Sequence, residues 1–138
     1  MLTLDANIWV AAFDPRDRFH ARSVAFLRAV AQKGLGLHGP AFVTLEVACA
    51  LARRASDSAV GAVVYERLRA HPALALHPLD DQFFETAREL GVQLLLRGGD
   101  ALYAATAKLL EAPLITWDDE LVKRAKALTP DTWLAARV

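Results

Sequence analysis

The sequence predicts an α/β protein in which helices cover both faces of a central, mainly parallel β-sheet. Four short apolar runs have the length and composition of buried strands. Longer segments with helical spacing of apolar residues separate these runs, and glycine or proline lies at most junctions. Short strands that alternate with helices are typical of a three-layer α/β/α fold.

In the first half of the chain, a buried strand is predicted at residues 1–4, followed by a short helix at residues 8–13. An Asp-Pro pair ends that helix. Residues 16–33 have one apolar face and are predicted to form a second helix, which two glycines end. A strand at residues 35–38 and a Gly-Pro pair then lead into an almost entirely apolar helix at residues 41–54.

The second half of the chain shows the same alternation of strands and helices. Gly91 could end the predicted helix at residues 80–94 early. A glycine pair introduces the next helix. The predicted elements are, in order, a helix at residues 57–70, a strand at 74–77, helices at 80–94 and 100–110, a strand at 113–116, a helix at 118–128 and an edge strand at 131–135.

Length and composition indicate one domain, residues 1–138, with a substantial core, because 54% of the residues are apolar and 23% are charged. The longest uncharged stretch, residues 34–45, is interrupted by Gly, His and Pro, so we expect no membrane-spanning helix. No basic region precedes Asp5, so we expect no secretory signal. Cys49 is the single cysteine, which excludes a disulfide framework and fits a cytoplasmic location.

Sixteen basic and sixteen acidic residues cancel, unlike the strongly basic balance of proteins that bind nucleic acid by charge alone. A nuclease remains compatible with this balance. Acids gathered in one pocket would leave an excess of Arg and Lys elsewhere, and a bound metal ion would reverse the sign of the pocket.

Several acids lie where a parallel sheet would bring them together. Asp5 follows the first predicted strand, Asp100 opens a helix after two glycines, and Asp118 follows the last core strand. Each could instead cap a helix N-terminus, and Asp119 and Glu120 suit the positive end of a helix dipole. Because strand ends meet at the carboxyl edge of a sheet, where ligands bind, we expect the first three acids to share a pocket.

Glu46 is the most unusual of these acids, because it lies within an apolar helical segment. A carboxylate in such surroundings is costly unless it is paired or binds a metal ion. An ion pair with Arg53 is the alternative that the sequence offers.

Clustered carboxylates repel one another, so a cluster of this kind usually holds a cation. Ligand sets made only of oxygen favour Mg²⁺ or Mn²⁺ over Zn²⁺. Such ions activate water and stabilise the leaving oxygen in phosphodiester cleavage. The acids therefore predict a metal-dependent hydrolase of phosphodiester bonds.

The same residues carry a resemblance to a known family. Its motifs are LDANIWV with Asp5 and Asn7, VTLEV with Glu46, GGDALYAATA with Asp100, and LITWDDEL with Thr116 and Asp118. In their order and spacing the chain resembles the PIN-domain ribonucleases, and among them the VapC toxins of prokaryotic type II toxin–antitoxin pairs. The similarity covers nearly the whole chain.

The resemblance implies a Mg²⁺- or Mn²⁺-dependent endoribonuclease that cuts single-stranded RNA, forms a homodimer and is inhibited by a cognate antitoxin. It implies that four acids hold the metal directly or through water, and that two polar residues position them. The metal ligands would be Asp5, Glu46, Asp100 and Asp118, with Asp119 as a doubtful fifth ligand, and the positioning residues would be Asn7 and Thr116.

Outside the acids, Arg97, Lys123 and Arg124 could hold the RNA backbone, although a solvated helix face is the alternative for each. Trp9 and Phe13 could face a partner protein or pack in the core. The histidines lie in unrelated places, and the predicted mechanism needs none of them.

Three other functions are alternatives to a toxin nuclease. A haloacid-dehalogenase-like phosphatase needs a second Asp where this chain has Asn7, and no glycine-rich dinucleotide fingerprint follows the first strand. A PIN-like module that binds RNA or protein without cutting, and an RNA-processing nuclease that is not a toxin, are the remaining alternatives.

Overall fold

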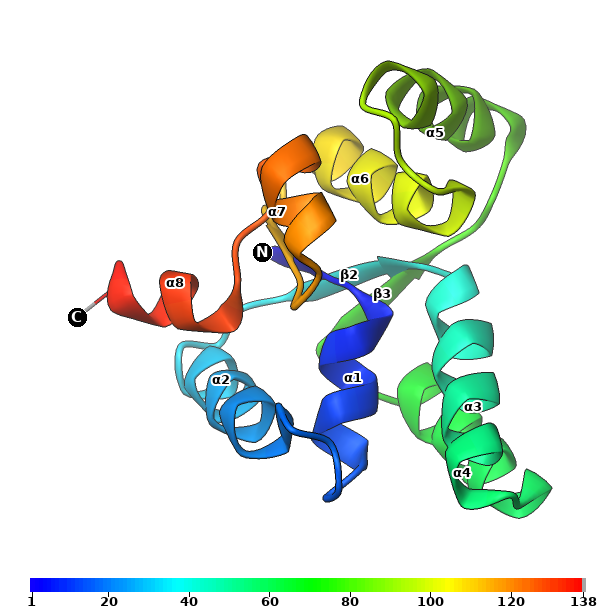
Figure 1. The fold of residues 1–138 in the computed structure, drawn as a ribbon, viewed down its shortest axis with the longest axis vertical. Coiled ribbons are helices and arrows are strands. Elements are labelled where there is room, and N and C mark those ends of the chain that lie inside the picture. Colours follow the sequence, from blue (N-terminus) through cyan, green and yellow to red (C-terminus); the bar gives the residue numbers. More distant parts are fainter. Residues whose placement is uncertain (138) are drawn as a thin grey trace.

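The computed structural model describes residues 1–137 (Figure 1), and Val138, the last residue of the predicted domain, lies outside the described residues. The strands are β1 (Leu2–Leu4), β2 (Leu37–Pro40), β3 (Leu74–His77) and β4 (Leu114–Ile115). The helices are α1 (Ala6–Phe13), α2 (His20–Gln32), α3 (Phe42–Ala55), α4 (Ser58–Arg69), α5 (Asp81–Gln93), α6 (Gly98–Leu110), α7 (Asp119–Ala125) and α8 (Pro130–Ala135).

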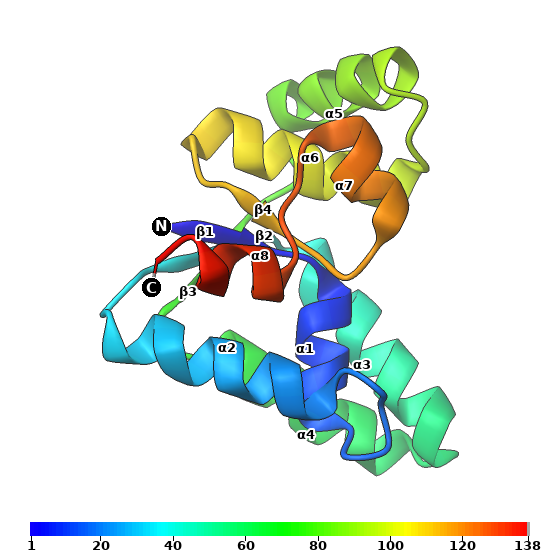
Figure 2. The same ribbon diagram turned by 60° about the vertical axis from the view of Figure 1, so that its left-hand side comes forward.

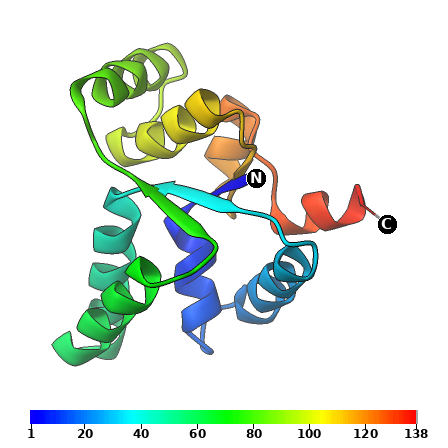
Figure 3. The same ribbon diagram turned by 180° about the vertical axis from the view of Figure 1, so that it is seen from behind.

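The sheet has the strand order β3-β2-β1-β4, and every pairing is parallel. Helices α1 to α4 cover one face, and α5, α6 and α7 lie on the other, as the front and rear views both show (Figures 1 and 3). This arrangement confirms the predicted three-layer α/β/α fold. Strand β1 lies between β2 and β4. After β2 the chain continues into α3 on one face of the sheet, and after β4 it continues into α7 on the other face (Figure 1). Such a change of face opens a crevice at the carboxyl end of the strand between them, β1.

The central strands are buried on both sides, as expected for a parallel sheet between helix layers. Leu4 and Ile115 pair in register and are fully buried. On one side of the sheet, α3 and α4 pack closely at Gly61, where a Cβ atom would come within 2.9 Å of the carbonyl oxygen of Ala48. Such packing gives the site a rigid support.

The predicted edge strand at residues 131–135 is wrong, because this segment forms helix α8 (Figure 2). Thr129 caps the helix by accepting a hydrogen bond from the backbone N–H of Thr132, and Pro130 occupies the first turn, where its missing N–H costs nothing. Trp133 is fully buried against α2. Thr129 and Pro130 are helix-start signals that are visible in the sequence.

Two other predicted helix boundaries were wrong. Helix α2 begins only at His20, because the carboxylates of Asp14 and Asp17 accept backbone N–H groups in the preceding turns. By contrast, α5 confirms the predicted helix at residues 80–94 and continues through Gly91, where a Cβ atom would lie 3.0 Å from the Cβ atom of Ala101 on α6. Helix α7 ends before Lys126, whose left-handed backbone turns the chain back toward β4.

Among residues 1–137, no helix is both long enough and apolar enough to cross a membrane.

Candidate active site

The neighbouring strands β1 and β4 bring Asp5 beside Thr116. The backbone N–H of Asp5 donates to the carbonyl of Ile115 at 3.0 Å, which extends the strand pairing to the acid itself. The Asp5 side chain is buried and does not cap α1. Its Oδ2 instead accepts hydrogen bonds from Thr116 Oγ1 at 2.6 Å and from Asn7 Nδ2 at 3.1 Å.

Asn7 and Thr116 fix this end of the site. Asn7 Nδ2 also lies 3.0 Å from Thr116 Oγ1, and its Oδ1 accepts the backbone N–H of Trp117 at 3.1 Å. Thr116 Oγ1 accepts the backbone N–H of Asp118 at 2.9 Å. The two residues therefore hold the start of α1 against the turn after β4, and they orient one oxygen of Asp5.

Glu46 reaches the same region from α3 and is half-buried. Its Oε1 accepts a hydrogen bond of 2.6 Å from the hydroxyl of Tyr103 on α6, and within residues 1–137 it forms no ion pair with Arg53. Burial and the charge of Glu46 raise the pKa of Tyr103, so the phenol stays protonated and donates. Tyr103, which sequence reasoning missed, lies one helical turn after Asp100 and so shares its face of α6.

Asp100 and Asp118 form the outer part of the site, and Arg97 joins them. Asp100 lies in the first turn of α6 and makes no capping bond, whereas Asp118 caps α7 through its Oδ1. Arg97 donates from Nε to Asp100 Oδ2 at 2.9 Å and from Nη2 to Asp118 Oδ2 at 2.7 Å. The prediction that Arg97 lies outside the pocket is therefore wrong.

Electrostatics show that the acids affect one another. Burial is the largest of the causes that together raise the pKa of Asp5 to about 7. The negative charges of Glu46 and Asp100 also raise this pKa, whereas the hydrogen bond from Thr116 lowers it. A buried carboxylate with a raised pKa, beside other acids, is typical of a site that holds a cation.

These four acids suit Mg²⁺ or Mn²⁺ by their chemistry, since all the donors are carboxylate oxygens. With the side chains as they stand in residues 1–137, no three acidic, histidine or cysteine groups converge on one point. The Arg97 guanidinium lies instead between Asp100 and Asp118. Asp100 and Asp118 would therefore have to exchange this guanidinium for a divalent cation in order to hold it.

Arg97→Gln is expected to raise the affinity for Mn²⁺, because it removes a competing positive charge from two of the acids. Arg97 is 68% exposed, so solvent screens its ion pairs and the gain should be about three- to tenfold. Calorimetric titration with Mn²⁺ measures this without any cleavage. Arg124→Gln is the control, because Arg124 bonds Glu120 and the carbonyl of Leu95 instead. Unchanged or weaker Mn²⁺ binding by Arg97→Gln would contradict the competition.

The other residues singled out in the sequence lie away from the acids' contacts. Asp119 and Lys123 are exposed on α7. Trp9 is buried and Phe13 packs against the core, so both have a core role.

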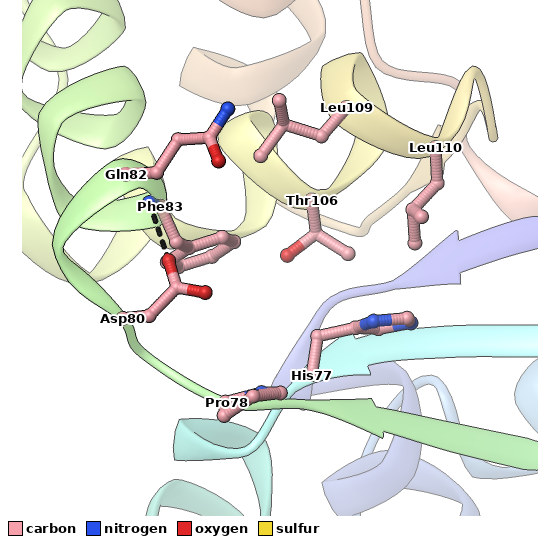
Figure 4. A pocket seen from close by; sticks show the side chains of 8 residues that line it. All are labelled: His77, Pro78, Asp80, Gln82, Phe83, Thr106, Leu109 and Leu110. Carbon is pink, nitrogen blue, oxygen red and sulfur yellow. Dashed lines mark hydrogen bonds between the residues drawn. The ribbon is translucent and has the colours of Figure 1, made fainter.

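A separate hollow of about 190 Å³ lies between β3, α5 and α6 (Figure 4). His77, Thr106 and Leu109 line it, and its acid, Asp80, caps α5 by accepting the backbone N–H of Phe83 at 2.8 Å. His77 Nε2 lies 2.9 Å from His38 Nδ1 on the neighbouring strand. Nothing in this hollow resembles the acid cluster.

With the geometry established, comparison with known proteins identifies the family. The sequence model of the PIN domain matches residues 2–127. The chain belongs to the PIN-domain family. Among curated proteins no sequence matches it significantly.

Solved structures of similar fold include several proteins of toxin–antitoxin systems. Mycobacterium tuberculosis VapC20, a toxin that cleaves the sarcin–ricin loop, has a TM-score of 0.75 at 19% identity, with 89% of this PIN-domain chain and 94% of that chain covered. FitAcB from Neisseria gonorrhoeae has a TM-score of 0.67 at 22% identity, with 96% and 99% covered. VapBC2 from Rickettsia felis, bound to a promoter DNA fragment, has a TM-score of 0.69 at 18% identity, with 93% and 95% covered.

Proposed function

We propose that this PIN-domain protein is a Mg²⁺- or Mn²⁺-dependent endoribonuclease that hydrolyses phosphodiester bonds of single-stranded RNA. The observation that carries the proposal is the gathering of Asp5, Glu46, Asp100 and Asp118 at the carboxyl edge of the sheet, with a buried member whose pKa is raised to about 7. The fold shared with VapC20 supports the same reaction class.

The residues of the chain would share the work. Asp5, Glu46, Asp100 and Asp118 would hold the cation, and Asp119 is kept as a further candidate ligand. When bound, the cation supplies a Lewis acid that lowers the pKa of water and neutralises negative charge on the phosphate. Thr116 and Asn7 keep one oxygen of Asp5 in place, and Tyr103 orients Glu46. Arg97, once displaced from the acids, is free to bind a phosphate of the RNA backbone.

We propose further that the protein is the toxin of a VapBC-type pair, with a cognate antitoxin and a second copy of the chain as partners in the cytoplasm. The presence of toxin–antitoxin complexes among the proteins of similar fold supports the antitoxin. Light scattering of the protein alone and after co-expression with the product of a neighbouring small gene tests both partners.

Cleavage of a labelled RNA pool in Mg²⁺, Mn²⁺ or EDTA tests the nuclease. The wild type should cut with metal and not in EDTA, and Asp100→Asn should cut about 100-fold less or not at all, because removing a ligand costs at least as much as removing a residue that orients one. Asp81→Asn is the matched control, since Asp81 is an exposed aspartate in the first turn of α5. Cleavage by Asp119→Asn decides whether Asp119 is a ligand.

RNA that both the wild type and Asp100→Asn bind but never cut, with either metal, would overturn the enzyme and leave a PIN-like binding module. Cleavage without any toxicity on expression would favour an RNA-processing nuclease instead.

A further inference from the structure

A second hollow, of about 270 Å³, lies directly beside the acids. The residues that line it are Asn7, Val10, Asp17, Arg18, Phe19, Arg54, Trp117 and Asp118, and Arg54 is paired with Asp17. Asp118 is one of the four acids of the candidate active site, and Asn7 donates a hydrogen bond to another of them, Asp5. Under the proposed function, a group that occupies this hollow would lie next to the acids at which the RNA is cut.

Two aromatic rings form one side of this hollow. Phe19 and Trp117 are stacked with ring centroids 4.3 Å apart and planes within 6° of parallel, and both are partly exposed. Trp117 is fixed by hydrogen bonds, from its backbone N–H to Asn7 Oδ1 at 3.1 Å and from its indole Nε1 to Ser23 Oγ at 2.8 Å. The backbone N–H of Phe19 donates to Asp17 Oδ1 at 2.8 Å. The aromatic surface is thus pre-organised.

Positive charges surround the stacked rings. The guanidinium carbon of Arg18 lies 4.5 Å from the ring centroid of Phe19, and that of Arg22 lies 4.8 Å from the ring of Trp117. Arg22 is paired with Asp131, whereas Arg18 is exposed and forms no ion pair within residues 1–137. Arg18 can therefore move to a phosphate without breaking an ion pair.

We propose that this hollow binds a nucleobase of single-stranded RNA, next to the phosphate that is cut, by stacking on the Phe19–Trp117 pair. Aromatic rings and guanidinium planes are the surfaces on which splayed bases stack in proteins that bind single strands. The base takes the place of the Arg18 guanidinium over the Phe19 ring, and Arg18 then contacts the phosphate beside that base. This inference rests on the proposed function, which identifies the ligand as RNA. A base bound in the hollow would help to determine where the RNA strand is positioned.

The fluorescence of Trp117 tests this directly. The other two tryptophans, Trp9 and Trp133, are 2% and 0% exposed, so quenching by a stacked base reports Trp117. The full chain carrying Asp100→Asn, which leaves RNA intact, is titrated with a mixed hexaribonucleotide and with an abasic ribose-phosphate hexamer of the same length and charge. We expect the hexaribonucleotide to quench saturably, and the abasic hexamer to bind about tenfold more weakly without quenching.

Single substitutions separate stacking from charge. Phe19→Leu should weaken binding of the hexaribonucleotide about tenfold and leave binding of the abasic hexamer unchanged. Trp117→Phe should keep most of the affinity but lose the quenching. Tyr65→Leu is the matched control, since Tyr65 forms a similar cation–π pair with Arg69 on α4.

Equal binding of the two hexamers, or a loss of both in Phe19→Leu, would overturn the base site. If the wild type cuts RNA but the two hexamers bind alike, the base site alone fails. If the hexaribonucleotide binds and quenches but the wild type never cuts, the nuclease alone fails.

Discussion

Asp5→Asn is expected to abolish metal-dependent cleavage while it stabilises the metal-free protein. Cleavage should fall about 100-fold or more, because Asp5 is the most buried of the four proposed ligands. Stability should change in the opposite direction, because the buried carboxylate has a pKa raised from 3.8 to about 7. An amide of the same shape removes the charge and can still accept the hydrogen bond from Thr116.

The sign of the pH dependence follows from linkage. Between pH 4 and pH 7 the folded state keeps a proton on Asp5 that the unfolded state has lost, so the free energy of unfolding of the wild type falls as the pH rises through this range. The loss is at most about 1.4 kcal/mol per pH unit, or about 4 kcal/mol between pH 4 and pH 7. The advantage of Asp5→Asn should therefore be absent near pH 4 and complete above pH 7.

Urea denaturation in EDTA at pH 4.5 and pH 8 measures this difference. Asp81→Asn serves again as the control, because Asp81 is exposed. An equal difference between wild type and Asp5→Asn at both pH values would show that the ionisation of Asp5 is not the cause. Saturating Mn²⁺ should reverse the order of stability, since it stabilises the wild type alone.

Trp133→Ala is expected to cost about 3–5 kcal/mol of stability, which is the range for deleting a large, fully buried aromatic side chain. Trp133 contacts the ring of Phe26 on α2 edge-on, with centroids 5.3 Å apart. The substitution would leave a cavity and remove the main anchor of α8.

Chemical denaturation followed by circular dichroism checks the loss. Trp133→Phe keeps a ring against Phe26 and should cost less than half as much. A loss below about 1 kcal/mol in Trp133→Ala would mean that α8 is dispensable for the fold.

Local signals accounted for most of the elements and for the candidate ligands. Apolar strands of matching length and helical periodicity predicted the α/β/α layers, and the position of Asp5 and Asp118 after strands predicted where they would lie. The predicted elements were wrong where a side chain bonds to the nearby backbone and overrides the apolar periodicity of the segment. Asp14 and Asp17 hold turns that precede α2, and the Thr-Pro pair at the start of α8 specifies a helix where a short apolar run suggests a strand.

The sequence by itself determined the fold class and the family, because periodicity and the order of the acids are properties of short segments. Tertiary structure alone decided which distant residues meet. It placed Arg97 between Asp100 and Asp118, set Tyr103 against Glu46, and stacked Phe19 on Trp117. These pairs depend on the strand order that puts β4 beside β1, and no local pattern specifies that order.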